Sequence, residues 1–376
     1  FIGSPSIWQL TQTVLLGFIG ISGPVTFASD RMKDVVTTTL TILGFFTVLV
    51  PFLYFFKRVT PIPRQSEEER EIIKSLIKLD VDQDSLGYFA TRFDKSGDPF
   101  GEYSLWPEAI QEFLNIAKNH AWTPAVMGAS DRGGEVWVEH ADMLAIDIGD
   151  EAVINVKDFT IEGKPMGNVR NMINKVTRKG YVATSQRWHE LDEETKSELR
   201  KLTKQWRYGA DERGFSMSMD RFGDDLDADT VITIVHCEKK IMGLLYFVPW
   251  STHSISLDRM QRDRDADAGV NELMITSAVE YARSHGMKYV SLNFAAFRSL
   301  FERADKISAG PVTRGMRNII RLFSNFFQVE SLFRFNAKFY PEWQTRYVLY
   351  PKARDLPSVA WAAIKAEQFI KGFGKR

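Results

Sequence analysis

The sequence predicts a mixed α/β protein whose folded part follows a membrane-spanning region. Residues 35–56 are free of charge over 22 positions, and a hydrocarbon core of roughly 30 Å needs about 20 apolar residues of helix. From residue 87 onward, segments with strand and helix periodicity alternate, which is the pattern of an α/β fold. A hydrophobic share of 44% and a charged share of 26% are ordinary for a globular protein.

The membrane region is predicted to occupy residues 1–62, with helices near 7–27 and 35–56. Lys57, Arg58 and Arg64 directly follow the second span, whereas the short loop before it is balanced in charge. The positive-inside rule therefore predicts a multi-pass protein of the cytoplasmic membrane, with everything after Lys57 in the cytoplasm. Self-association into a homo-oligomer through this region is a further expectation.

The next segments are predicted to form a linker helix and a small α/β domain. The helix is expected within residues 63–84, because Ser66 precedes three glutamates in a capping pattern. The domain is expected at 85–165, with one amphipathic helix, Trp106–Asn119. Its predicted strands are Gly87–Arg92, Ala121–Met127, Glu135–Val138 and Met143–Ile148.

Residues 166–210 are predicted to connect this domain to a second one. They contain a basic helix at 166–179, a strand at 180–185 and a helix, Glu193–Trp206. Arg170, Lys175 and Arg178 lie on the polar side of the basic helix. That side is either a solvated face or a face that contacts phosphates of RNA or lipid, since cations set against a nucleic-acid backbone release counterions.

Residues 211–355 are predicted to form a second α/β domain, followed by a terminal helix at 356–376. A basic amphipathic helix is expected at 312–329, with Arg314, Arg317 and Arg321 on one side. It either packs on the core or lies on an anionic bilayer. A further helix starts near Val270, and the predicted strands are 230–236, 242–250, Ser254–Leu257, Tyr289–Phe294 and Tyr347–Tyr350.

The candidate site lies where the strand starting at Ser254 gives way to the helix near Val270. Ligands of α/β folds bind at loops that follow strand ends. A loop that mixes arginines with carboxylates suits a polyanionic ligand together with a proton acceptor. The candidate residues at this place are Asp258, Arg259, Arg262, Arg264, Glu272, Asn293 and Arg298.

Several kinds of chemistry lack support in the sequence. The single cysteine, Cys237, excludes an internal disulfide and a cysteine-cluster metal site. The six histidines show no paired metal-ligand spacing, so no metal is expected, and only His253 is kept as a weak candidate for proton transfer. No Walker or dinucleotide glycine motif is present. The loop Gln261–Gly269 has the wrong glycine spacing for an acyl-CoA site, and its aspartates would repel a pyrophosphate.

Several motifs resemble one family over residues 85–351 nearly end to end. The chain is similar to the actinobacterial branch of the phosphatidylglycerol lysyltransferases, the multiple peptide resistance factor family. The motifs that carry this resemblance are GDEAVINVKDF, GLLYFVPW, SLDRMQRD, NELM, SLNFAAFRSLFER and ESLFRFNAKFYPEW.

The resemblance implies two tandem acetyltransferase-like (GNAT-like) domains behind a polytopic membrane region. It also implies transfer of an amino acid from aminoacyl-tRNA to the glycerol hydroxyl of phosphatidylglycerol, which changes membrane charge and gives resistance to cationic antimicrobial peptides. Lysine is the commonest amino acid in the family, and alanine is the alternative. Aminoacyl-tRNA is then the co-substrate, phosphatidylglycerol and the anionic membrane are partners, and no cofactor is expected.

The resemblance also implies roles for single residues. Asp258 and Arg262 fall in the family's catalytic motif, although relatives usually read Asp-Leu-Met-Arg where this chain has Asp-Arg-Met-Gln. Glu272 would bind the amino group of the aminoacyl moiety, and Lys338 would neutralise the tRNA terminus or the oxyanion. A surface salt bridge is the alternative for Asp258 and for Lys338. Phosphates of lipid or tRNA would be taken by Arg298, Arg334 and Arg346.

Two other function classes stay open from the sequence. One is an enzyme of the same fold with another substrate, either an aminoacyl-tRNA-dependent peptidoglycan-precursor transferase or an acyl-CoA transferase. The other is a non-catalytic lipid-flipping module.

Overall fold

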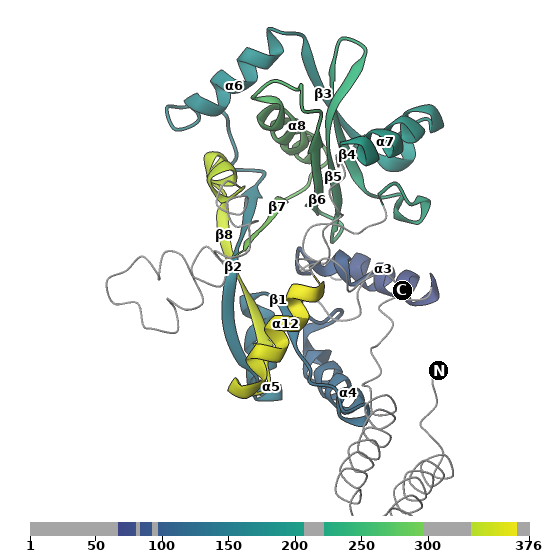
Figure 1. Cartoon of the computed structure of the whole chain (residues 1–376), viewed down its shortest axis with the longest axis vertical. Coiled ribbons are helices and arrows are strands. Elements are labelled where there is room, and N and C mark those ends of the chain that lie inside the picture. The colour runs from purple at the N-terminus through teal and green to yellow at the C-terminus, as the bar shows by residue number, and fades with distance from the viewer. Residues whose placement is uncertain (1–66, 80–82, 92–96, 207–221, 297–331, 367–376) are drawn as a thin grey trace, which may run out of the picture. The chain divides into compact units, whose positions relative to one another are not determined.

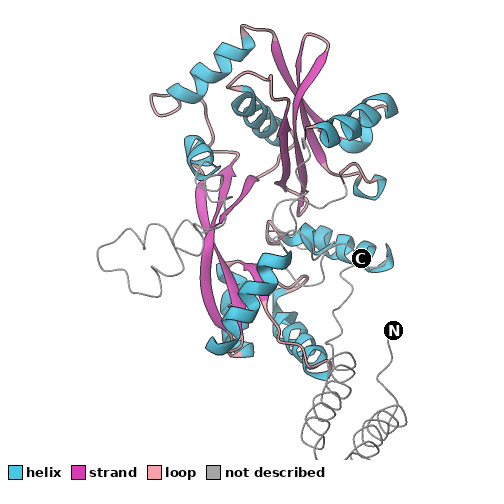
Figure 2. Ribbon diagram, viewed as in Figure 1, coloured by secondary structure: helices cyan, strands magenta, loops and turns pink. Residues whose placement is uncertain are grey.

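A mixed sheet of eight strands organises the part of the chain that the computed structural model describes (Figures 1 and 2). The strand order is β1-β8-β2-β7-β6-β5-β4-β3, and every neighbouring pair is antiparallel except β6 with β7. The described residues are 67–79, 83–91, 97–206, 222–296 and 332–366. The strands are β1 (Val126–Ala129), β2 (Leu144–Asn155), β3 (Tyr181–Arg187), β4 (Val231–Cys237), β5 (Lys240–Trp250), β6 (Ser254–Arg262), β7 (Tyr289–Ala296) and β8 (Glu342–Tyr350).

The sheet is continuous across the predicted domains. β8 lies between β1 and β2, so residues from the predicted second domain complete the sheet of the first. The predicted connecting segment 166–210 supplies β3, which pairs with β4 at the edge. Residues 63–376 accordingly form one compact unit, distinct from residues 1–62.

Amphipathic periodicity predicted most helices well. α4 has the predicted bounds, and α7 differs from the prediction by one residue. Among the described residues, no helix is long and apolar enough to cross a bilayer. The predicted spans at 7–27 and 35–56, and the basic helix at 312–329, lie outside the described residues. The helices are α3 (Glu67–Leu79), α4 (Trp106–Asn119), α5 (Asp131–Ala141), α6 (Gly167–Thr177), α7 (Glu193–Gln205), α8 (Val270–Ser284) and α12 (Leu356–Ala366).

Helices α8 and α7 cover opposite faces of the strands β4 and β5 (Figure 1). Successive strand residues point to opposite faces. On β5, Leu245 and Phe247 join the core beneath α8, whereas Leu244 and Tyr246 join the core beneath α7. Both sides of β5 are therefore buried, as its nearly continuous apolar sequence indicates.

The predicted strand Glu135–Val138 is wrong, because these residues lie in α5. Ser130 caps this helix by accepting a hydrogen bond from the Gly133 N–H (3.1 Å). The Asp98 carboxylate packs against the first turn, where a Cβ at Gly133 would come within 1.9 Å of Oδ1. Two adjacent glycines weaken a helix, so the local sequence favours a strand and the cap and tertiary contact decide otherwise.

The predicted strand Gly87–Arg92 is also wrong. Residues Gly87–Thr91 form a 3-10 helix, in which the Gly87 N–H donates to the Asp84 carbonyl and the Phe89 N–H donates to the Leu86 carbonyl, both at 3.0 Å. Tyr88 and Phe89 pack on Val248 of β5 in a small core of their own. Alternation over five residues does not distinguish a strand from a tight helix whose aromatic residues are buried.

Two strands of the first half also differ from the prediction in extent. β1 starts at Val126 and overlaps the predicted Ala121–Met127 in two residues only. β2 continues through Gly149 to Asn155, past the predicted end at Ile148, with a bulge between Asp147 and Gly149 opposite β8. A bulge lets a glycine remain inside a strand, so Gly149-Asp150 is not the end of the strand.

Candidate active site at the opening between β6 and β7

Asp258 is the extra residue of a bulge in β6. On β5, Tyr246 pairs with Arg259 and Phe247 pairs with Leu257, so Asp258 has no partner in the ladder. β6 runs to Arg262, so Asp258 and Arg259 are strand residues and not loop residues as predicted. Asp258 is 3% exposed, which rules out the alternative of a surface salt bridge. Bulges occur often next to active sites, where they re-aim side chains.

Asn293 lies in a matching bulge on β7. Opposite β2, Glu151 pairs with Phe294 and Val153 pairs with Ser291, so β7 carries one more residue than β2 over this stretch. Asn293 adopts φ +66°, a left-handed conformation that asparagine tolerates better than most residues. Its Nδ2 donates to the Leu257 carbonyl at 2.7 Å. The Asn293 side chain thus joins the two bulges.

The strands β6 and β7 separate beyond this point. Their parallel pairing covers only Ser254–Ser256 with Tyr289–Ser291. After it, β6 stays with β5 and β7 stays with β2. A sheet that opens between the carboxyl ends of two parallel strands is the place where α/β folds bind ligands. The predicted site therefore lies at a real opening in the sheet.

Glu272 and Lys338, both predicted site residues, form an ion pair of 3.0 Å. Glu272 lies in the first turn of α8 and is buried, and Lys338 belongs to the 3-10 helix Ala337–Phe339 and is about one-third exposed. The Lys338 ammonium also lies 5.0 Å from the centre of the Phe335 ring. Because one partner is buried, this pair differs from the surface salt bridge that is the alternative for Lys338.

Asp258 and Arg259 lie with aromatic residues of the α7 side. The Arg259 guanidinium is 5.3 Å from the centre of the Phe222 ring, and Phe222 packs on Tyr246. Burial raises the pKa of the Tyr246 phenol above its usual value, and the charges of Asp227 and then Asp258 add to this effect. The Thr230 hydroxyl lies 2.9 Å from the Tyr246 oxygen. Sequence reasoning missed Tyr246, because an isolated tyrosine inside an apolar strand carries no signal of function.

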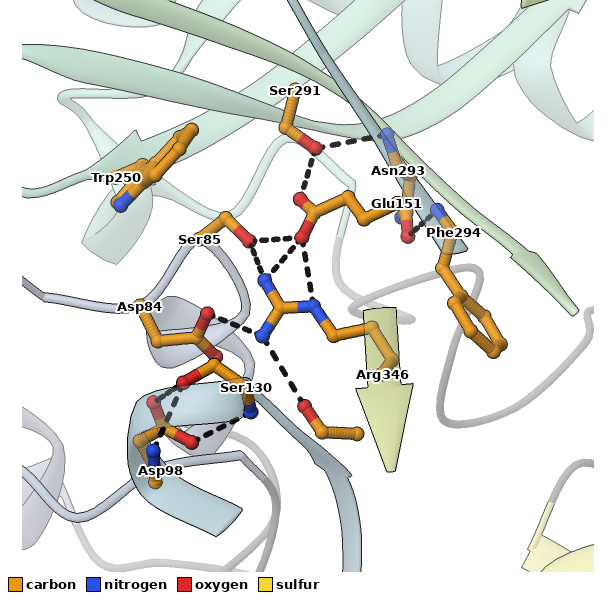
Figure 3. Close-up of polar contacts among 12 residues, drawn as sticks. Asp84, Ser85, Asp98, Ser130, Glu151, Trp250, Ser291, Asn293, Phe294 and Arg346 are labelled. Carbon is orange, nitrogen blue, oxygen red and sulfur yellow. Dashed lines mark hydrogen bonds and ion pairs between the residues drawn. The ribbon is translucent and has the colours of Figure 1, made fainter. Parts of the chain in front are cut away.

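Arg346, predicted to bind phosphate, is 1% exposed and paired with carboxylates (Figure 3). Its Nε donates to Glu151 Oε2 at 2.9 Å, and its Nη1 lies 2.6 Å from Asp84 Oδ1. Burial opposes the charge of Arg346, but Asp84 and Glu151 raise its pKa above the usual value. The guanidinium is thus occupied within the protein, and the phosphate-binding role does not fit this geometry.

The other predicted basic residues are spread around the structure. Arg262 donates to the Ala266 carbonyl at 2.8 Å and so holds the loop before α8. Arg170 donates to the carbonyls of Ile161 (2.6 Å) and Gly163 (2.8 Å). Exposed predicted residues are Lys175 on α6, Arg178 at the C-terminal cap of α6, Arg334 before the 3-10 helix, Arg264 and His253. Outside the described residues lie Arg298, Arg314, Arg317 and Arg321.

Two polar residues near the opening escaped the sequence reasoning. Glu151 is fully buried on β2, and its carboxylate accepts a hydrogen bond from Ser291 of β7. A buried glutamate needs partners, so the GDEAV stretch inside an apolar run was the available signal. Within the described ranges, no group of three or more histidine, cysteine, aspartate or glutamate side chains is arranged to hold a metal ion.

The fold and these residues define the class. The part of the chain that the structure describes is an α/β fold with one mixed sheet, which opens between two bulged parallel strands beside buried acidic and basic side chains. A family model described as phosphatidylglycerol lysyltransferase, C-terminal, matches residues 83–350. The chain belongs to this family.

The relatives carry names consistent with the family model. The lysylphosphatidylglycerol biosynthesis bifunctional protein LysX of Nocardia farcinica is 35% identical over 91% of this chain and 32% of its own length. LysX of Mycobacterium tuberculosis is 36% identical over 81% of this chain and 28% of its own length. The chain thus spans about a third of these curated relatives.

A solved structure shares the fold. The structure of L-PGS from Bacillus licheniformis matches with a TM-score of 0.68 at 20% identity, covering 82% of this chain and 98% of that one. At this identity the likeness concerns the fold.

Proposed function

We propose that the chain transfers an amino acid, lysine in the first instance, from aminoacyl-tRNA to the glycerol hydroxyl of phosphatidylglycerol. The observation that carries this proposal is the family match over residues 83–350, which contains the opening between β6 and β7. The curated relatives are named for lysylphosphatidylglycerol biosynthesis. The product would carry more positive charge than its substrate and so weaken binding of cationic peptides.

The reaction needs no external energy source, because an aminoacyl ester is already activated. The lipid hydroxyl oxygen bonds to the ester carbonyl carbon, and the bond from that carbon to the tRNA ribose oxygen breaks. The hydroxyl proton passes to a base and then to the departing ribose oxygen. The protein must therefore orient two substrates, accept one proton and stabilise an oxyanion.

We assign the proton acceptor to Asp258, buried in its bulge. Removing water strengthens electrostatic interactions in such a place. Arg262 supports this assignment by fixing the loop that follows β6, through its bond to the Ala266 carbonyl.

We assign recognition of the amino acid to the pair Glu272–Lys338. A substrate ammonium that binds Glu272 competes with Lys338 for the same carboxylate, because the pair is only 3.0 Å apart. Displaced Lys338 would then be available to stabilise the oxyanion or the tRNA terminus. In this scheme Glu272 releases the Lys338 ammonium only when the aminoacyl group is bound.

The proposal extends to partners and location. The exposed Lys175 on α6 and Arg178 at its C-terminal cap support contact with the phosphates of tRNA or lipid. We propose that the sheet represents two fused acetyltransferase-like halves, that 7–27 and 35–56 span the membrane, and that the described part faces the cytoplasm.

The test is aminoacylation of phosphatidylglycerol vesicles by the purified chain, with radiolabelled lysyl-tRNA and then alanyl-tRNA. We expect a labelled lipid that does not form when the aminoacyl-tRNA is digested with RNase beforehand. We expect the rate of labelling to fall about 100-fold or more in Asp258→Asn. Asp265→Asn is the control, since Asp265 is exposed in the next loop. Transfer to a peptidoglycan precursor or from acyl-CoA, with no labelled lipid, would overturn the proposal.

A further inference from the structure

We propose that Glu151 is a positioning residue that acts through Ser291 and Asn293 on the strand carrying Asp258. This inference rests on the proposed function and adds Glu151 and Ser291, to which the sequence analysis gave no role. The hydrogen-bonded chain from Glu151 to Leu257 is called the relay below. It connects β2, β7 and β6 in turn.

The relay begins with a carboxylate that is held at both oxygens (Figure 3). Glu151 Oε2 accepts hydrogen bonds from Arg346 Nε at 2.9 Å and from Ser85 Oγ at 2.7 Å. Oε1 accepts the hydrogen bond from Ser291 Oγ. Glu151 and Ser291 are each 0% exposed, so water does not compete for these bonds. The Ser291 hydroxyl therefore has one defined orientation.

The second link holds the bulge of β7. The Ser291 hydroxyl donates a hydrogen bond to Glu151, and its Oγ accepts a hydrogen bond from the Asn293 N–H at 3.0 Å. The extra residue of a bulge lacks a ladder partner, and here the serine supplies one. A left-handed backbone at a residue other than glycine persists only where its surroundings fix it. Ser291 is thus part of what fixes Asn293 at φ +66°.

The third link crosses from β7 to β6. Asn293 Nδ2 donates to the Leu257 carbonyl at 2.7 Å, and Asn293 Oδ1 accepts from the Phe294 N–H at 2.7 Å. The parallel ladder ends at the pair Ser256 and Ser291, so this side-chain bond joins the strands beyond that end. Leu257 immediately precedes Asp258. The relay therefore sets where the Asp258 bulge lies relative to β7.

The two serines at the end of the ladder provide a matched test. Ser291 and Ser256 are paired in register, and both are fully buried. Ser291 Oγ makes the first two of the three hydrogen bonds of the relay, whereas Ser256 Oγ has no hydrogen-bond partner in the described part of the chain. Ser291→Ala and Ser256→Ala are thus the same chemical change at neighbouring buried positions. Only Ser291→Ala removes hydrogen bonds of the relay.

The experiment measures kcat and KM of the full chain for aminoacyl transfer into phosphatidylglycerol vesicles. We expect Ser291→Ala to lower kcat about 100-fold with little change in KM for aminoacyl-tRNA, because misplacing a catalytic group by about 1 Å costs that much. Ser256→Ala should retain the wild-type kcat. Asn293→Gly, which keeps the backbone conformation but lacks the amide, should lose as much as Ser291→Ala.

The double variant shows whether these residues act in one chain. In Ser291→Ala with Asn293→Gly, we expect the kcat of either single variant, because one break already interrupts the relay. If the two substitutions acted independently, their fold-losses of kcat would multiply, and that result would overturn the relay. If Ser291→Ala does not fold, Asn293→Gly with wild-type kcat would overturn it as well.

The outcomes separate this inference from the proposed function. A wild-type chain that labels no lipid refutes both the function and the relay. A wild-type chain that is active, with Ser291→Ala folded and as active as Ser256→Ala, refutes the relay alone.

Discussion

The carboxylates around Arg346 outnumber the charge that it carries. The carboxylates of Asp84, Asp98 and Glu151 are all buried close to this one guanidinium. Burial raises the pKa of Asp84 most; Arg346 opposes this effect, while Asp98 and Glu151 add to it, for a value of about 7. Burial also raises the pKa of Asp98. When Asp84 is protonated, Arg346 pairs with the Glu151 carboxylate, so the fold favours the neutral form of Asp84.

The raised pKa of Asp84 predicts how stability changes with pH. The folded chain binds this proton more tightly than the unfolded chain, whose carboxyl has a pKa of 3.8. The contribution is complete below that value and is lost as pH rises to about 7. Asp84→Asn cannot ionise, so its free energy of unfolding should fall less over this interval. Urea unfolding at about pH 5 and about pH 8 measures the difference.

The control for this prediction is Asp265→Asn, which removes an exposed carboxylate. It should follow the wild-type pH dependence. If Asp84→Asn followed it as well, Asp84 would already be ionised in the folded protein at low pH, contrary to the effect of its burial.

Single residues show what sequence reasoning could and could not reach at the site, and the roles that it gave them stay predictions. Glu272 and Lys338 were predicted from the resemblance, and the structure places them in contact. Glu151 and Ser291 were missed because their contact depends on which strands are neighbours, and β2 and β7 are far apart in the chain. Arg346 was predicted to bind phosphate, because an arginine in a basic, aromatic stretch of sequence carries no sign of burial.

At the scale of elements, α5 shows how one contact overrides local preference. The Asp98 carboxylate accepts from the Ser130 N–H at 2.9 Å and from the Ser130 hydroxyl, and it lies against Gly133. Gly134, the next residue, faces open packing, with Tyr347 Cδ2 3.8 Å from the position of a Cβ. The two glycines therefore have different reasons to be in this helix.

These neighbouring glycines predict opposite effects of the same substitution. Gly133→Ala places a methyl group 1.9 Å from a buried carboxylate oxygen and should destabilise the protein by about 1–3 kcal/mol. Gly134→Ala meets no clash and should stabilise it by up to about 1 kcal/mol through helix propensity. Thermal and urea unfolding compare the two variants. Equal effects would mean that Asp98 does not constrain the helix.

Elements also show why the fold was predictable only in part. Helices with a long apolar stripe, such as α4 and α7, were found with nearly correct bounds. Short segments were not, because five residues of Gly87–Thr91 fit a strand or a tight helix equally well. Strand ends were missed where a bulge keeps pairing past a glycine or a charged residue, as at Gly149 and Asp258.

At the scale of the whole molecule, Arg346 connects β8, the last described strand in sequence, to the first half of the chain. It belongs to β8, and it contacts Glu151 of β2, Asp84 and Ser85. The strand order could not be predicted from the sequence, since no pattern in residues 342–350 indicates that β8 pairs with β1 and β2.

Loss of this arginine should therefore affect the stability of the whole unit. Arg346→Met leaves two buried carboxylates without their cation and should cost about 3–5 kcal/mol in the free energy of unfolding. Arg354→Met, at an exposed turn after β8, should change it by less than about 0.5 kcal/mol. Urea unfolding distinguishes the two, and equal stability would show that the buried cluster contributes nothing net.

The position of β8 has a consequence for how the chain is made. During synthesis the N-terminal half emerges first, but β2 gains its sheet neighbours only after residues 289–350 have left the ribosome. Until then β1 and β2 present open edges, which pair readily with other chains. Such long-range pairing also folds slowly. The nascent chain therefore passes through a vulnerable interval, in which a chaperone or delayed release would most improve its yield.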